Sequence, residues 1–129
     1  MRRILTSLCA LAAFLWLPAG DVLAGNLNVG DLNAAGKRVA DEHCSRCHVV
    51  GEANRMGGIG STPSFALLRR MRDWEERYAS FFARNPHPSF ITVKGLSHTR
   101  TLPPNAAPIT LTEQQVDALM VYVREMKVE

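Results

Sequence analysis

The chain has 129 residues, a formal net charge of +3 and a hydrophobic content of 47%. This length allows one folded domain at most. Such a small net charge gives no reason to expect nucleic acid as a partner, and any partner must be selected by a local surface patch.

The first 24 residues have the features of a secretory signal peptide rather than of a folded domain. A short basic start, Met1–Arg3, precedes the apolar run Ile4–Leu17, and small or aliphatic residues lead up to Ala24. We therefore predict a signal peptide over residues 1–24, cleaved after Ala24, and one periplasmic domain over residues 25–129. A retained membrane anchor is the alternative, but the apolar run is shorter than the ~20 residues that span a bilayer.

The domain begins with a predicted helix that ends at about Cys44. Either Asp31 or Asn33 can serve as its N-cap. Gly36 lies in the middle of this helix, where glycine lowers stability unless it has a packing role. We therefore expect another helix to pass close to Gly36.

The most informative stretch is Cys44-Ser45-Arg46-Cys47-His48, a C-x-x-C-H motif typical of covalent c-type haem attachment. Two thiols one helical turn apart can bond the two vinyl groups on one edge of a porphyrin, and the adjacent imidazole can reach the iron. The motif therefore predicts one haem c, tethered by Cys44 and Cys47, with His48 as the proximal iron ligand. Removal of the signal peptide would also remove Cys9, so the mature chain would contain only Cys44 and Cys47. The motif assigns both of these cysteines to haem attachment.

Two other interpretations of these thiols are weaker. A structural zinc site would also use the C-x-x-C spacing, with further ligands among His43, His87 and His98, but no second Cys-x-x-Cys or His-x₃-His pair follows. A redox-active dithiol would be expected within a βαβ pattern, and none is visible in the sequence.

Residues 51–62 are rich in glycine and predict a loop that lets the backbone pass close to the porphyrin. A helix over residues 64–84 follows, broken near Asp73, where a new N-cap can form. An apolar stripe along this helix is expected to face the core; its members are Leu67, Met71, Trp74, Tyr78 and Phe81. The basic residues off the stripe predict a solvated face, with a docking patch for an acidic partner as the alternative; they are Arg69, Arg70, Arg72 and Arg77.

The segment Asn85–Phe90 has no assigned role. Prolines on both sides of His87 prevent a regular helix, so we interpret this histidine as a surface turn residue rather than as a ligand. Residues 91–93 are expected to form a short extended piece at most.

The terminal helix has a strong predicted start, with Thr112 as N-cap and Gln115 at the capping-box position. Apolar residues then recur at helical spacing, at Val116, Leu119, Met120 and Val123. Tyr122 lies beside this stripe. We expect the first and last helices to cross, with an aromatic residue over Gly36.

Taken together, these features resemble a class I cytochrome c. A helix with Gly36 leads into C-x-x-C-H, a Gly-x-x-Pro-Ser-Phe turn follows at residues 60–65, and Pro-Pro precedes the terminal amphipathic helix. The resemblance implies an all-α fold, in which a few short helices surround one covalently bound haem and the N- and C-terminal helices cross. It also implies a monomeric single-electron carrier between periplasmic redox partner proteins, and a Pro63 carbonyl that accepts the Nδ1 proton of His48.

The second axial position of the iron is the open question. The family usually places a methionine just before Pro-Pro, where this chain has Leu102, and leucine has no lone pair for iron. His98, in the same loop, is the predicted distal ligand, and paired histidines would lower the reduction potential relative to a His/Met pair. The alternatives are an open or water-bound iron facing Leu102, or a methionine from elsewhere, for which Met56 in the glycine loop is the plausible candidate.

The identity of the distal ligand distinguishes between possible functions of the protein. A six-coordinate iron favours an electron carrier, whereas an open iron would bind small gaseous ligands. A third class is a haem subunit docked on a periplasmic dehydrogenase, with the segment Asn85–Phe90 as contact surface. We expect no enzymatic activity, because no acid–base constellation accompanies the motif.

Overall fold

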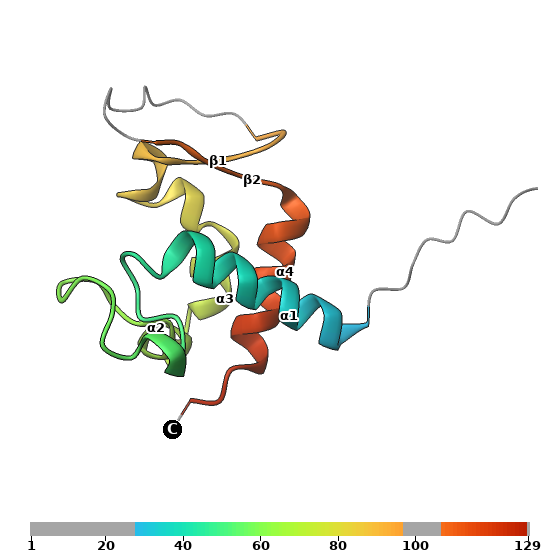
Figure 1. Cartoon of the computed structure of the whole chain (residues 1–129). Helices are drawn as coiled ribbons and strands as arrows, with labels where there is room; N and C mark the ends of the chain where they lie inside the picture. The colour runs from blue at the N-terminus through green and yellow to red at the C-terminus, as the bar shows by residue number, and fades with distance from the viewer. Residues whose placement is uncertain (1–27, 97–106, 129) are drawn as a thin grey trace, which may run out of the picture.

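The structure, a computed structural model, describes residues 28–96 and 107–128. Its α-helices are α1 (Val29–Val39), α2 (Phe65–Arg69), α3 (Trp74–Ala79) and α4 (Glu113–Glu125). Short helical turns and two strands complete the described part: η1 (Ala40–Cys44), η2 (Glu52–Asn54), η3 (Phe81–Ala83), η4 (His87–Ser89), β1 (Ile91–Val93) and β2 (Ile109–Leu111) (Figure 1). The helical architecture confirms the all-α prediction, to which the two strands are a small addition.

Two sequence-based predictions fall outside the described residues. These are the signal peptide over residues 1–24 and the loop that holds His98 and Leu102. Within the described ranges, no helix is both long enough and apolar enough to cross a membrane.

The first and last helices pack against each other, as the sequence predicts (Figure 1). At the crossing, a Cβ atom on Gly36 would lie 1.9 Å from the carbonyl oxygen of Ala118 and 2.8 Å from the Cβ of Tyr122. Glycine is therefore needed here because the α4 backbone occupies the space of a side chain. The expected aromatic neighbour of Gly36 is confirmed as Tyr122.

A side-chain cap fixes the N-terminus of each of these two helices. At α4, Thr112 Oγ1 accepts from the Gln115 backbone N–H at 3.2 Å, and Gln115 Oε1 accepts from the Thr112 N–H at 2.8 Å, which confirms the predicted capping box.

At α1 the predicted N-caps, Asp31 and Asn33, are wrong, because Asn28 Oδ1 accepts from the backbone N–H of Asp31 at 2.9 Å. Asparagine is an equally good N-cap, and this start lengthens the helix. α1 then continues through the π-helical turn η1 to Cys44.

The predicted long helix over residues 64–84 is broken, as expected, near Asp73. The Asp73 side chain bonds Arg77 Nε at 2.8 Å instead of capping α3, so that detail of the prediction is wrong. The prediction of a single apolar stripe that faces the core is also wrong at Leu67, which is 52% exposed. Phe65, which is not part of that stripe, is buried together with Tyr78. The break explains this result, because α2 and α3 do not share one helical register.

The two strands form a parallel pair, with Ile91 opposite Ile109 and Val93 opposite Leu111. The pairing is extended at both ends, since Ile109 N donates to the Phe90 carbonyl and Lys94 N donates to the Leu111 carbonyl, each at 2.8 Å. Leu111 is fully buried with Leu119, Val123 and Val50. The segment that follows η4 is therefore attached directly to the start of α4.

Replacement of Gly36 by alanine tests the helix crossing. We expect Gly36→Ala to lower the free energy of unfolding by about 1–3 kcal/mol, because the new methyl group meets backbone rather than a movable side chain. Urea unfolding of the purified protein measures the change. Gly60→Ala is the matched control, since a Cβ there has nothing within 4 Å. Equal losses in the two variants would contradict the close crossing.

Candidate functional site

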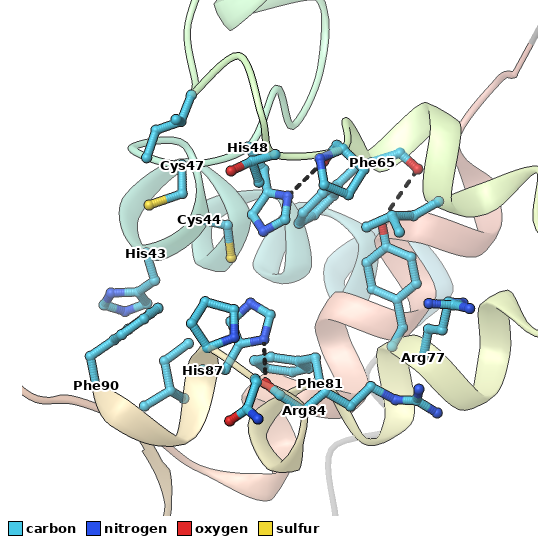
Figure 2. Close-up of a pocket in the computed structure, with 18 of the residues that line it drawn as sticks. His43, Cys44, Cys47, His48, Phe65, Arg77, Phe81, Arg84, His87 and Phe90 are labelled. Carbon is cyan, nitrogen blue, oxygen red and sulfur yellow. Dashed lines mark hydrogen bonds between the residues drawn. The ribbon is translucent and has the colours of Figure 1, made fainter. Parts of the chain in front are cut away.

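A cavity of about 610 Å³ lies between the C-x-x-C-H segment and the η3–η4 segment. Its size is within the range of small-molecule and cofactor sites. The wall is mostly apolar and includes the side chains of Ile59, Phe65, Leu68, Phe81, Phe90 and Ile91. Figure 2 shows Phe65, Phe81 and Phe90 around the cavity. A large, flat and mostly apolar group is the kind of occupant that such a wall favours.

Both cysteines of the motif line this cavity as free thiols. The turn that holds them is closed by backbone bonds, in which the N–H groups of Cys47 and His48 donate to the Cys44 carbonyl at 3.1 and 2.9 Å. Burial, followed by the charge of Cys47, raises the pKa of Cys44 to about 12. A thiol with such a pKa is a poor nucleophile at neutral pH, which argues against the redox-active dithiol interpretation.

His48 is oriented by the backbone, as the family resemblance implied. Its Nδ1 donates to the Pro63 carbonyl at 2.7 Å. Because a carbonyl oxygen can only accept, the proton sits on Nδ1 and the Nε2 lone pair is free for a metal. The ring packs against Phe65 at 5.5 Å between centroids, and Nε2 faces the cavity (Figure 2).

The loop after the motif is held by Asn54, a residue that no sequence motif indicates. Asn54 Oδ1 accepts from the N–H groups of Val50 and Gly51 at 2.9 and 3.2 Å, and its Nδ2 donates to the His48 carbonyl at 3.0 Å. An asparagine in a glycine-rich loop is a common turn residue, and that is the signal that could have indicated it. Gly58 lies over the same backbone with φ at 76°, where a Cβ would be 3.0 Å from the His48 carbonyl carbon.

His87 lies across the cavity from His48, so its interpretation as a surface turn residue is wrong. The two ring centroids are 6.0 Å apart and the ring planes are 15° from parallel. His87 Nδ1 donates to the Arg84 carbonyl at 3.1 Å. The ring of His87 also packs against Phe81 and Phe90, with centroid distances of 5.5 and 5.9 Å. Burial lowers the pKa of His87, although the bond to Arg84 acts in the opposite direction.

The other candidate metal ligands have different outcomes. His98 lies outside the described residues. Met56 is wrong as a candidate, because its side chain is 99% exposed and does not line the cavity. The zinc interpretation gains no support, since residues 28–96 and 107–128 contain no group of three or more His, Cys, Asp or Glu side chains that could hold a metal ion.

The predicted solvated arginine face is only partly confirmed. Arg70 and Arg72 are exposed, but Arg69 stacks its guanidinium on the Trp74 ring at 3.9 Å. Arg77 lines the cavity while it bonds Asp73. Arg69 and Arg77 therefore have local structural partners, whereas Arg70 and Arg72 fit the predicted solvated face.

These features define a class of protein. Two thiols and a neighbouring imidazole, held at the wall of an apolar cavity behind crossed terminal helices, match the needs of a covalently attached haem. The donor set fits this group, since both thiols are free and the His48 tautomer leaves Nε2 available.

The comparisons with known proteins agree with this class. The family model described as Cytochrome c matches residues 33–127, which is most of the chain. The chain therefore belongs to the cytochrome c family, and its cofactor is one covalently attached haem c. Searches of curated proteins and of solved structures found no match.

Replacement of Asn54 tests the support of the loop. We expect Asn54→Ala to lower the free energy of unfolding by about 2 kcal/mol, because it leaves the Val50 and Gly51 N–H groups without their acceptor. The neighbouring Arg55→Ala removes only an exposed ion pair with Glu52 and should change stability by less than about 0.5 kcal/mol. Urea unfolding of both variants checks the difference, and equal stabilities would show that Asn54 does not hold the loop.

Proposed function

We propose that this chain is an exported, mono-haem electron carrier that passes single electrons between periplasmic redox partners. The observation that carries the proposal is the orientation of His48, whose Nε2 faces the cavity that the two free thiols also line, while its Nδ1 is bonded to Pro63. Family membership supports the haem and the electron-transfer role.

Cys44 and Cys47 are the proposed attachment residues. Each thiol would add across one vinyl group of the haem, with the sulfur bonded to one carbon and the proton transferred to the other, so that no oxidant is consumed. When bound, the haem supplies an iron that gains or loses one electron. The chain provides the tether, a ligand of fixed orientation and an apolar wall that limits access of water.

His48 is the proposed proximal ligand, and Pro63 is its positioning partner. The bond from Nδ1 to a backbone carbonyl keeps the ring in one tautomer and raises the basicity of Nε2. Asn54 holds the His48 carbonyl from the opposite side of the loop. These two bonds fix the orientation in which His48 would hold the iron.

The cellular setting follows from the N-terminal sequence. The basic start, the apolar run and Ala24 support export and cleavage, which would leave a periplasmic domain over residues 25–129. We propose a carrier rather than an enzyme, because none of the described residues that line the cavity is a carboxylate that could form an acid–base pair with a histidine.

Cysteine variants test the attachment. We expect the wild-type protein to keep its pigment through acid–acetone extraction and to carry the mass of one haem. Cys44→Ala and Cys47→Ala should each leave one thioether link and a lower yield of pigmented protein. The double variant should release all of its pigment, because no covalent bond to the haem remains.

Cys9→Ala is the matched control, since this cysteine lies in the predicted signal peptide. Intact-mass measurement should give the same mature protein with one haem. A wild-type protein that is colourless, or a double variant that retains pigment after extraction, would overturn the proposed function.

A further inference from the structure

We propose that His87 is the second axial ligand of the haem iron, so that this cytochrome holds its metal between two histidines. The inference rests on the proposed function, which supplies His48 as the first ligand. It differs from the sequence-based choice of His98 and gives a role to the segment Asn85–Phe90, which the sequence left without one.

The separation of the two rings fits a shared metal ion. A metal–imidazole bond is about 2 Å long, and the ring centre lies roughly 1 Å beyond the bonded nitrogen, so two imidazoles on opposite sides of one metal have centroids about 6 Å apart. In the structure, the centroids of His48 and His87 are 6.0 Å apart. The gap between them is thus one metal ion wide.

The protonation of the two rings also fits. His87 Nδ1 bonds the Arg84 carbonyl just as His48 Nδ1 bonds the Pro63 carbonyl, at 3.1 and 2.7 Å. Each carbonyl requires a proton on Nδ1, which leaves each Nε2 with a free lone pair. Figure 2 shows the two backbone bonds on the outer sides of the pair and the rings facing each other across the cavity. A bond from the second nitrogen to a backbone carbonyl is the usual support of a metal-bound histidine.

The chain holds His87 in this position from several directions. Phe81 and Phe90 contact its ring edge to face, and proline neighbours restrict the backbone on both sides. The Phe90 carbonyl accepts from Ile109 N, which joins the segment to the β1–β2 pair. These contacts hold the His87 ring at the cavity wall through its own segment.

His43 is the other described histidine at the cavity wall, and its position suits iron less well. Figure 2 shows it at the edge of the cavity, away from the axis through His48 and His87. Its Nε2 lies 3.8 Å from a carboxylate oxygen of Glu42. We therefore treat His43 as a wall residue and use it as a control.

A spectroscopic comparison of single variants tests the inference. We expect the wild-type protein to be low-spin in both redox states, with no sulfur-to-iron band in the near infrared. His87→Ala should keep its covalent haem and become high-spin, and added imidazole should restore the low-spin spectrum. His87→Met should remain low-spin, gain the sulfur-to-iron band and show a higher reduction potential, because a His/Met pair raises the potential of haem iron.

His98→Ala and His43→Ala are the matched controls, and both should keep the wild-type spectrum. A low-spin spectrum in His87→Ala without added imidazole would overturn the inference, as would a high-spin wild type. Conversion to high spin by His98→Ala, with His87→Ala unaffected, would assign the iron to His98 instead. In these cases the haem still survives extraction, so failure of this inference is distinguishable from failure of the proposed function, in which no haem is attached.

The ring planes provide a second readout that a merely structural role for His87 would not produce. They are 15° from parallel. Nearly parallel axial imidazoles lift the degeneracy of the two iron d orbitals that overlap with the imidazole π systems, and they give a rhombic low-spin electron paramagnetic resonance signal with three resolved features. We expect this signal from the oxidised wild type. A single feature at large g, typical of perpendicular imidazoles, would contradict the described orientation.

Discussion

The hydrogen bond from His48 Nδ1 to the Pro63 carbonyl is the interaction on which the site depends. It determines which nitrogen carries the proton and therefore which nitrogen faces the cavity. A backbone carbonyl is a suitable partner because it cannot change its protonation state. The loop from the motif to Pro63 is fixed in turn, since Phe65 N donates to the Val49 carbonyl and Ile59 N donates to the Cys47 carbonyl, each at 2.9 Å. The fixed orientation of His48 thus depends on the whole closed loop.

The helix crossing and the site are parts of one structure. Tyr122 lies so close to Gly36 that a Cβ on the glycine would be 2.8 Å from the Tyr122 Cβ, and the Tyr122 hydroxyl donates to the Val50 carbonyl at 2.7 Å. Val50 follows His48 by two residues and is itself fully buried. One residue of α4 therefore secures both α1 and the segment that leaves the C-x-x-C-H motif. A side chain at Gly36 would displace Tyr122 and disturb the site as well as the helix packing.

The sequence predicts those features that depend on neighbouring residues or on one unusual residue type. The C-x-x-C-H motif, the Thr112 capping box and the role of Gly36 each depend on residues close in sequence or on an unusual residue type. The position of His87 depends on long-range contacts. Flanking prolines exclude a regular helix, but they do not show which way a turn faces. That direction is set by β1 and β2, whose parallel pairing joins residues far apart in the chain. The network around Asn54 was missed for a similar reason, because its backbone donors become neighbours only after the loop closes.

The proposed ligand role of His87 also changes how this chain compares with its family. A leucine at position 102, where the class I cytochromes that the sequence resembles usually have methionine, suggests an incomplete iron site as long as the ligand is sought in that loop. With His87 as the ligand, that position has no coordinating role and leucine is compatible with a six-coordinate iron. The ligand then comes from a turn packed between Phe81 and Phe90. A metal held on both sides by rigid, neutral imidazoles changes its geometry little when it gains or loses an electron. Such a site favours rapid electron transfer over the binding of small gaseous ligands.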